Sequence, residues 1–212
     1  MDTEEMQQAE TPVAKVKSRG RPREFDHEEA LDKALNVFWK RGYEGASLSE
    51  LTDALGINRP SLYAAYGNKE ELFRKALDRY MSGPVAYAPD ALQEPTARKV
   101  VEKFLTDSAA LLANPDTPHG CMLVQGALSC GEGAQSISKL LAEYRNRFQQ
   151  ALRLRFEKAQ AEGDMPATID VAAMARYVVT IHQGLSVQGT SGATHKELLG
   201  VVGTVMANWP SP

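Results

Sequence analysis

The sequence predicts an all-α protein, because apolar residues recur at spacings of three and four along most of the chain. No stretch of any length alternates apolar and polar residues as a half-buried strand would. Gly and Pro interrupt the helical pattern and divide the chain into about nine segments. The 212 residues suit a small helical domain joined to a larger one.

Composition and charge narrow the class of protein. Hydrophobic residues make up 43% of the chain and charged residues 24%, which is typical of a soluble globular protein. The net charge of -3 excludes a protein that coats nucleic acid through overall positive charge, so any such contact must be local. Two cysteines, Cys121 and Cys130, are too few for a disulfide framework, and no signal peptide is recognisable. We therefore expect a cytoplasmic protein.

The first 24 residues read as a flexible arm. Residues 1–10 carry four acids and no base, whereas residues 15–23, KVKSRGRPR, carry five bases and no acid. Such a segment has too few apolar groups to order itself in the free protein. The expected domains are therefore a basic arm over 1–24, a first helical domain over 25–81 and a second over 82–212.

Four short helices are predicted in the first domain, over 27–41, 48–55, 59–66 and 69–81. Three of their starts pair a capping side chain with a Glu three residues later, so that both can bond free backbone N–H groups. The pairs are Asp26 with Glu29, Ser47 with Glu50, and Asn68 with Glu71. Gly42, Gly56 and Gly67 are expected to end the first three helices.

The second domain begins with a proline-rich segment, 82–95, which we expect to be a connector. Helical periodicity then returns. The predicted helices span 96–112, 121–129, 134–161, 171–188 and 195–208.

Segments 48–55 and 59–66 have the layout of a helix-turn-helix. Gly56 stands where the chain must turn sharply, and Asn58 can cap the second helix. Pro60 is tolerated because the N–H that it lacks would be unpaired in a first turn. This arrangement leaves the side chains of Arg59, Ser61 and Tyr63 to face outward.

These residues carry a resemblance to a known family. The stretch FWKRGYEGASLSELTDALGINRPSLYAAYGNKEELF is similar to the N-terminal domain of the tetracycline-repressor (TetR) family of transcriptional regulators. The similarity covers about residues 25–75 and depends on Gly42-Tyr43, the Ser47 cap, Gly56-Ile57, Leu62-Tyr63, Tyr66-Gly67 and Lys69 to Phe73. It implies a three-helix DNA-binding head followed by a helical ligand-binding and dimerisation domain.

The resemblance also implies roles for individual residues. Arg59, Ser61 and Tyr63 would face operator DNA, and Arg59 could read a guanine edge. Ser47 and Lys69, each at a helix start, would contact phosphates, whereas Tyr66 would pack the domain. The alternative for each polar residue is a solvated surface side chain.

The arm offers a second DNA contact. Arg19-Gly20-Arg21 resembles the core of an AT-hook, in which arginines enter a narrow A·T minor groove. The alternative is a solubilising tail that raises only non-specific affinity.

The last two predicted helices are expected to form a homodimer interface. Helix 171–188 is apolar on nearly all sides, so it should be buried on more than one. With helix 195–208 and the same pair from a partner, it would build a four-helix interface, which Gly184, Gly189 and Gly200 would let pack closely. The resemblance implies the same homodimer on a near-palindromic operator.

The resemblance further implies that the helices over about 96–162 enclose a small-molecule effector pocket. The candidate lining residues are Phe104, Cys121, Met122, Gln125, Tyr144, Phe148, Tyr177 and His182. For each of them the alternative is core packing, and His182 would then be a hydrogen-bonded core histidine.

Cys121 has two interpretations. At a helix N-terminus its thiol could have a lowered pKa and sense electrophiles, or it could be an inert buried thiol. Cys130 lies ~13 Å away if the helix is regular, too far for a disulfide.

Three functional classes follow. The first is a ligand-responsive repressor that an effector releases from its operator, with activation as an open alternative. The second is an enzyme that uses Cys121 with His119 or His182, which lacks a third orienting residue. The third is a helical interaction protein that never binds DNA. We expect the first, with no catalytic activity, no cofactor and no metal, and an effector that the sequence does not identify.

Overall fold

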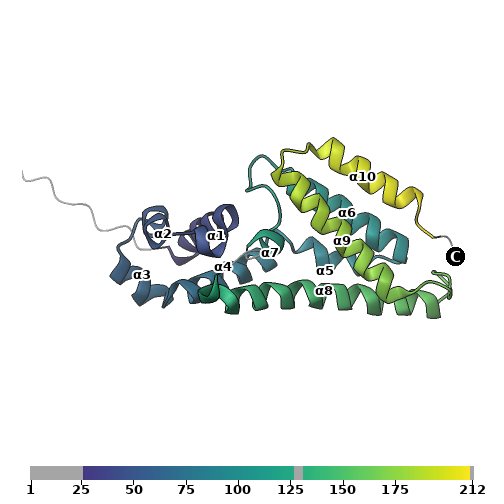
Figure 1. The fold of residues 1–212 in the computed structure, drawn as a ribbon, viewed down its shortest axis with the longest axis horizontal. Coiled ribbons are helices and arrows are strands. Elements are labelled where there is room, and N and C mark those ends of the chain that lie inside the picture. Colours follow the sequence, from purple (N-terminus) through teal and green to yellow (C-terminus); the bar gives the residue numbers. More distant parts are fainter. Residues whose placement is uncertain (1–25, 127–130, 211–212) are drawn as a thin grey trace, which may run out of the picture.

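The computed structural model describes residues 26–126 and 131–210, and within these ranges every regular element is a helix. The all-α prediction is therefore confirmed. Figure 1 shows a small group of helices at one end and a longer bundle that extends from it. Arg19 and Arg21 of the arm, Cys130 and the predicted helix end at Ser129 lie outside the described residues.

The first group, which we call the head, contains the four predicted helices. They are α1 (His27–Gly45), α2 (Leu48–Leu55), α3 (Arg59–Tyr66) and α4 (Lys69–Ser82). Regular helical geometry in α1 breaks at Gly42, whose φ of 68° and ψ of 178° are not helical. The predicted stop is thus confirmed, although hydrogen bonding resumes for one turn beyond it.

The predicted caps are formed. Ser47 and Asn68 each accept the N–H of the Glu three residues on, and each Glu carboxylate accepts the N–H of its cap residue in return. Asp26 accepts from the N–H groups of Glu28 and Glu29. Satisfying these groups locally sets where each helix begins.

Aromatic side chains hold α1 against α4. The Phe73 ring meets Phe38 and Tyr43 edge-on, at centroid distances of 5.0 and 5.3 Å. At the outer edge, Arg79 of α4 pairs with Asp32 and Glu28 of α1 at 2.7 and 2.8 Å. The head is therefore fixed by its own core as well as by its capped helices.

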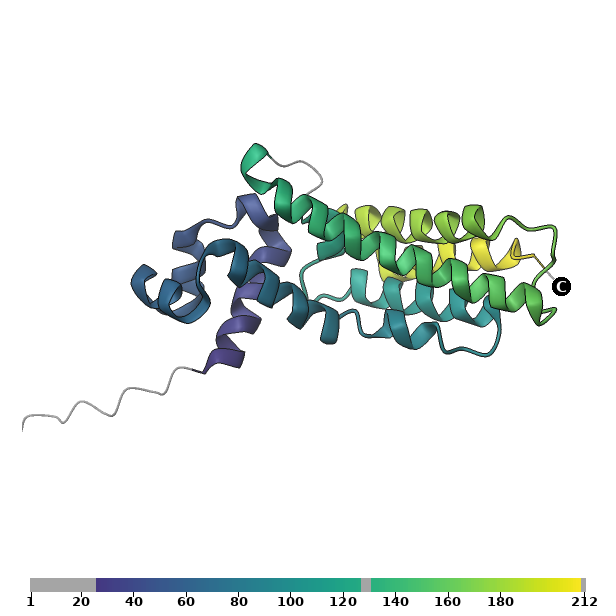
Figure 2. The ribbon, with the colours of Figure 1, turned by 90° about the horizontal axis from the view of Figure 1, so that it is seen from below.

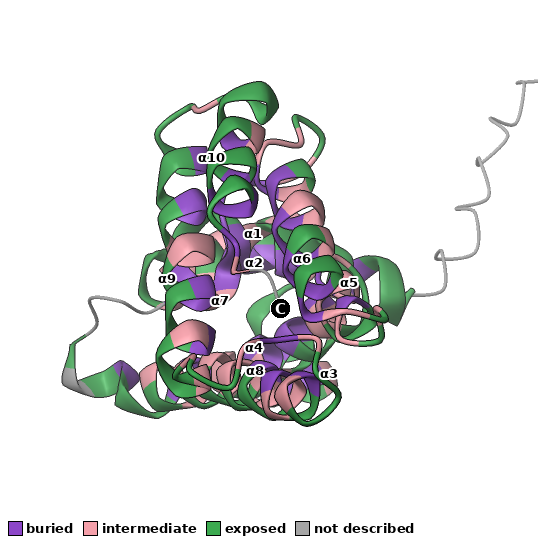
Figure 3. Cartoon of the chain, turned by 90° about the vertical axis from the view of Figure 1, so that its right-hand side faces the viewer, coloured by how far each residue is buried: buried purple, intermediate pink, exposed green. Residues whose placement is uncertain are grey.

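The second group, which we call the body, follows α4. It comprises α5 (Tyr87–Ala91), α6 (Ala97–Leu112), α7 (Met122–Gln125), a short 3₁₀ turn (Glu132–Ala134), α8 (Gln135–Ala161), α9 (Val171–Thr190) and α10 (His195–Ala207). Figure 2 shows α8 running from the head to the far end of the body. In the end-on view of Figure 3, buried residues line the inner sides of the helices and exposed residues the outer sides.

Each of the nine predicted helices has a counterpart, but two details differ. The predicted connector contains α5, because Val85 and Ala91 are buried and anchor a turn of helix over the core. The predicted helix over 121–129 has only four described helical residues before Gly126. A short apolar run does not reveal how far a helix extends.

One predicted glycine role is wrong. Gly189 does not face outward on α9, because a Cβ there would lie 2.8 Å from the Leu112 carbonyl oxygen of α6. Gly189 therefore permits close packing within the chain. Gly184 and Gly200, in contrast, have open space where a Cβ would stand.

Candidate nucleic-acid interface and ligand cavity

The turn between α2 and α3 has the geometry that the sequence predicts. Gly56 adopts a left-handed conformation with φ 69°, which a residue with a Cβ rarely adopts. Its N–H bonds the Asp53 carbonyl at 3.2 Å, and the Ile57 N–H bonds the Thr52 carbonyl at 3.1 Å. The turn therefore fixes the angle between the two helices.

Helix α3 presents a polar face to the surface. Leu62 is fully buried in the head, whereas Arg59, Ser61 and Tyr63 are exposed. Tyr63 is 47% exposed, which is unusual for a large ring that has a core within reach. Tyr66, as expected, is buried and donates its hydroxyl to the His27 carbonyl at 3.2 Å.

Two further predicted contacts lie at helix starts. Ser47 is exposed at the start of α2, where its hydroxyl accepts the Glu50 N–H at 3.1 Å. Lys69 opens α4, and its ammonium lies 4.6 Å from the centre of the Tyr43 ring. Partial burial lowers the pKa of Lys69, and the nearby Glu44 carboxylate opposes that shift. Contact with the Tyr43 ring holds this ammonium in a defined place at the start of α4.

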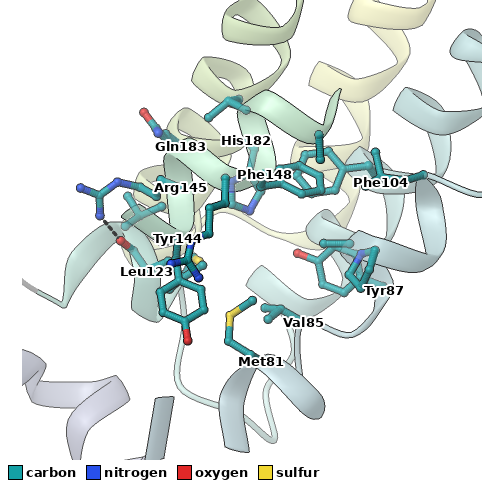
Figure 4. Close-up of a pocket in the computed structure, with 18 residues that line it drawn as sticks. Met81, Val85, Tyr87, Phe104, Leu123, Tyr144, Arg145, Phe148, His182 and Gln183 are labelled. Carbon is teal, nitrogen blue, oxygen red and sulfur yellow. Dashed lines mark hydrogen bonds between the residues drawn. The ribbon is translucent and has the colours of Figure 1, made fainter. Parts of the chain in front are cut away.

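The body contains an apolar cavity of about 280 Å³ that is partly open to the surface. Five predicted residues lie on its wall: Phe104, Cys121, Tyr144, Phe148 and His182. Figure 4 shows the rings of Phe104, Phe148 and Tyr87 gathered on one side of it. The Phe104 ring lies 4.5 Å from that of Phe148 and 5.1 Å from that of His182, centre to centre.

Three predicted residues do not line this cavity. Met122 is fully buried in the core, and Tyr177 is exposed on the outer side of α9. Gln125 points its amide toward the Ser186 carbonyl, at 3.5 Å. Periodicity identifies a buried face of a helix, but it does not tell which buried side chain borders a void.

The sequence does not identify several wall residues, because they stand in or beside the proline-rich segment 82–95, which indicates a connector. They are Met81, Val85, Tyr87, Ala88, Pro89 and Leu92. The available signal was the apolar set within 82–95, which α5 brings over the open side of α6 and α8.

The environment of Cys121 favours an inert thiol. Burial raises the pKa of the Cys121 thiol, and this effect outweighs the hydrogen bonds that it accepts from Tyr80 and from backbone N–H groups. Of the two interpretations of Cys121, the one with a lowered pKa is therefore wrong, because α7 is one turn long and its start is sealed from water. His119 is directed at the Leu112 carbonyl, at 3.4 Å.

Hydrogen bonds join the cavity wall to the head. The Trp39 indole N–H donates to the Gly120 carbonyl at 2.8 Å, and the Tyr43 N–H donates to the Gly126 carbonyl at 3.0 Å. Tyr144, whose ring lines the cavity, donates its hydroxyl to Asp78 of α4 at 3.4 Å. A change in the wall can therefore reach both α1 and α4.

Neither a metal-ligand cluster nor a membrane-spanning helix is present within residues 26–126 and 131–210. No group of three or more His, Cys, Asp or Glu side chains there could hold a metal ion. Among the same residues, no helix is long and apolar enough to cross a membrane.

Comparison with known families and proteins supports these observations. The family model "Bacterial regulatory proteins, tetR family" matches residues 30–76, and the model "Tetracyclin repressor-like, C-terminal domain" matches residues 96–190. The chain is 37% identical to the HTH-type transcriptional repressor ComR of Escherichia coli K12, over 92% of this chain and 93% of that protein. It is 32% identical to the repressor BdcR of the same organism, over 88% and 98%.

Solved structures agree. The chain matches a cysteine mutant of the TetR family transcriptional regulator CifR, complexed with 26 bp double-strand operator DNA, with a TM-score of 0.85. The two are 39% identical over 90% of this chain and all of that one. A TetR regulator from Rhodococcus sp. RHA1 is 43% identical over 88% of this chain and all of its own, with a TM-score of 0.61.

Proposed function

Because this chain belongs to the TetR family of bacterial transcriptional regulators, we propose that it is a cytoplasmic repressor that a small-molecule effector releases from a palindromic operator. Its role is regulatory and not enzymatic. Residues 25–81 would bind DNA, residues 82–212 would bind the effector and dimerise, and residues 1–24 would be a basic arm. The observation that carries the proposal is α3, which is anchored by Leu62 and exposes Arg59, Ser61 and Tyr63.

An exposed recognition helix suits the major groove. Arg59 lies at the first position of α3, and residues near the start of a recognition helix contact base edges. No described residue forms an ion pair with Arg59, so its guanidinium is available for a guanine edge. Ser47 and Lys69 would position the head on the phosphates.

The homodimer would form through α9 and α10. Both helices expose apolar residues on their outer sides, among them Tyr177, Val187 and Val201. Gly184 and Gly200 leave open space beside them, which lets helices of a partner approach closely. A symmetric dimer then places two heads on two half-sites of a palindrome.

Release by an effector would follow from the hydrogen bonds that join residues of the cavity wall to the head. Cys121 and Tyr144 line the cavity, and both are hydrogen-bonded to side chains of α4. A molecule that repositions either residue changes the support of α4, and with it the placement of α3. By thermodynamic linkage, effector and operator must weaken the binding of each other equally.

The test starts by selecting an operator from randomised duplexes with the full-length protein. Arg59→Ala and Tyr63→Ala should each weaken binding to the selected operator, Arg59→Ala by about 1–3 kcal/mol. Binding to random DNA should change far less. Arg153→Ala is the matched control, because Arg153 is an exposed arginine of α8 whose pair with Glu157 adds little stability.

Two results would contradict this function. One is a selection that enriches no sequence, and the other is operator binding that survives both substitutions in α3. Deleting residues 1–24 tests the arm separately. The deletion should make the plot of log affinity against log salt less steep, reducing the magnitude of its negative slope by up to ~4.

A further inference from the structure

We propose that the cavity binds a compact, mainly apolar molecule that carries no positive charge and has one hydrogen-bonding group, and that the imidazole of His182 is the partner of that group. This inference rests on the proposed function, since it specifies the class of effector. It comes from the size of the cavity, the charges around it and the bonding state of its polar groups.

The cavity volume limits the size of the ligand. At about 280 Å³ it lies just below the range usual for drug-sized ligands. A water molecule occupies ~30 Å³ of the liquid, so the cavity holds on the order of ten non-hydrogen atoms. A single aromatic ring with a short substituent fits this space.

The wall carries positive charge and no negative charge. Two wall residues, Arg145 and Arg147, carry a full charge. The Arg145 guanidinium donates to the Leu123 carbonyl, and Figure 4 shows it directed at that oxygen. Arg147 is largely exposed and lies against the Tyr144 ring, 5.6 Å from its centre. No Asp or Glu is among the lining residues, so a cationic ligand would also lack a counter-charge.

Most other polar groups of the wall are already paired. The Tyr87 hydroxyl bonds the Ser108 hydroxyl at 3.0 Å, and the Tyr144 hydroxyl donates to Asp78. The Cys121 sulfur accepts from Tyr80 at 3.4 Å. The amide of Gln183 is directed away from the rings of the cavity in Figure 4. A ligand therefore finds few partners for polar atoms of its own.

His182 is the exception. No described residue forms a hydrogen bond with its ring, which lies beside Phe104 in the apolar wall. Burial lowers the pKa of His182 to about 4, so at neutral pH the imidazole is uncharged and carries one donor and one acceptor. An unpaired polar group in an apolar wall costs free energy, and a ligand hydroxyl or carbonyl removes that cost. The unpaired imidazole therefore also selects against ligands that lack a hydroxyl or carbonyl group.

The test compares three probes of similar shape: ethylbenzene, 2-phenylethanol and 2-phenylethylamine. Binding of each to the full-length protein is measured by isothermal titration calorimetry at pH 7.5. 2-Phenylethanol should bind about 10-fold more tightly than ethylbenzene, which corresponds to one satisfied hydrogen bond. 2-Phenylethylamine should bind at least about 10-fold more weakly than the alcohol, because its ammonium must leave water and finds two arginines and no carboxylate on the wall.

Variants of His182 make the test specific. His182→Leu should abolish the preference for the alcohol over ethylbenzene, and His182→Gln, which keeps a donor and an acceptor, should restore part of it. His195→Leu changes an exposed histidine of α10 and is the matched control. Thermal unfolding of each variant verifies that it is folded.

Three outcomes would overturn the inference: tighter binding of 2-phenylethylamine than of the alcohol, an unchanged preference in His182→Leu, or no binding of any probe at millimolar concentration. Operator affinity is measured in parallel without and with 2-phenylethanol. If the alcohol binds but operator affinity is unchanged, the ligand class holds and the proposed release mechanism fails. If operator binding fails without any probe, the proposed function fails independently of the cavity.

Discussion

The hydroxyl of Tyr80 lies 3.4 Å from the sulfur of Cys121 and donates a hydrogen bond to it. The same hydroxyl accepts the N–H of Met122 at 3.3 Å. Tyr80 belongs to α4 of the head, whereas Cys121 borders the cavity of the body. One buried hydroxyl therefore joins the two functional halves of the chain.

Removing this hydroxyl should loosen that junction. Tyr80→Phe leaves the buried Met122 N–H without a partner, and we expect a loss of about 1–3 kcal/mol in the free energy of unfolding. Hydrogen exchange should accelerate at the amide of Met122. Urea unfolding and exchange measured by NMR test this, with Tyr63→Phe, at an exposed position of the head, as control. Unchanged exchange at Met122 would show that the bond does not hold the segment.

A substitution at Gly42 should be costly. Its φ of +68° strains any other residue, and a Cβ would lie 3.2 Å from the Gly126 carbonyl oxygen. Gly42→Ala should lower the free energy of unfolding by about 1–3 kcal/mol. Gly45→Ala, three residues away, meets only an ordinary contact at 3.5 Å and should be nearly neutral. Equal effects of the two in denaturant unfolding would contradict this account.

Charges on the outer sides of α9 and α10 should dissociate the dimer. Val187→Glu combined with Val201→Glu places two carboxylates on the proposed interface. Light scattering should then detect a monomer, and operator affinity should fall by about 100-fold or more, because the two heads no longer bind as one unit. Leu154→Glu, on the exposed side of α8, is the control and should remain dimeric. A doubly substituted protein that stays dimeric would place the interface elsewhere.

His182 should make the protein sensitive to acid. Its folded pKa of about 4 is below the usual 6.5, so between these values the unfolded chain binds more protons than the folded one. The free energy of unfolding is therefore not reduced by protonation of His182 above about pH 6.5, and it falls as the pH drops from 6.5 toward 4. The upper bound of this loss is on the order of 3 kcal/mol.

Urea unfolding at pH 7.5 and pH 5 measures this effect. His182→Gln should lose less stability between the two pH values than the wild type does. His195→Gln, at an exposed position of α10, should lose as much as the wild type. Equal pH dependence in all three proteins would contradict the burial of a neutral imidazole.

The head could be predicted nearly residue by residue, because its signals are local. Ser47 and Asn68 act as caps through side chains that bond the next three residues, and Gly56 is required by a single backbone angle. Burial of Leu62 and exposure of Tyr63 follow from their positions on one short helix. Such features need no knowledge of distant parts of the chain.

The cavity could be predicted only in part. Phe104, Phe148 and His182 were expected on its wall and lie there, but Met122 does not. The contribution of α5 was missed, because three prolines in 82–95 indicate a connector when the segment is considered alone. A void forms where several helices meet imperfectly, and the pattern of any one helix does not encode that.

The sequence alone therefore determined nine of the helices, the capped starts of those in the head and the residues that α3 exposes, since capping, glycine conformations and 3.6-residue periodicity act over a few neighbouring residues. Only the tertiary structure decided which buried side chains border the cavity. It also decided that the thiol of Cys121 is sealed, that Gly189 packs against α6, and that no described residue forms a hydrogen bond with the His182 ring. These properties depend on solvent access and on contacts between segments far apart in the chain, which arise when the helices of the body pack together.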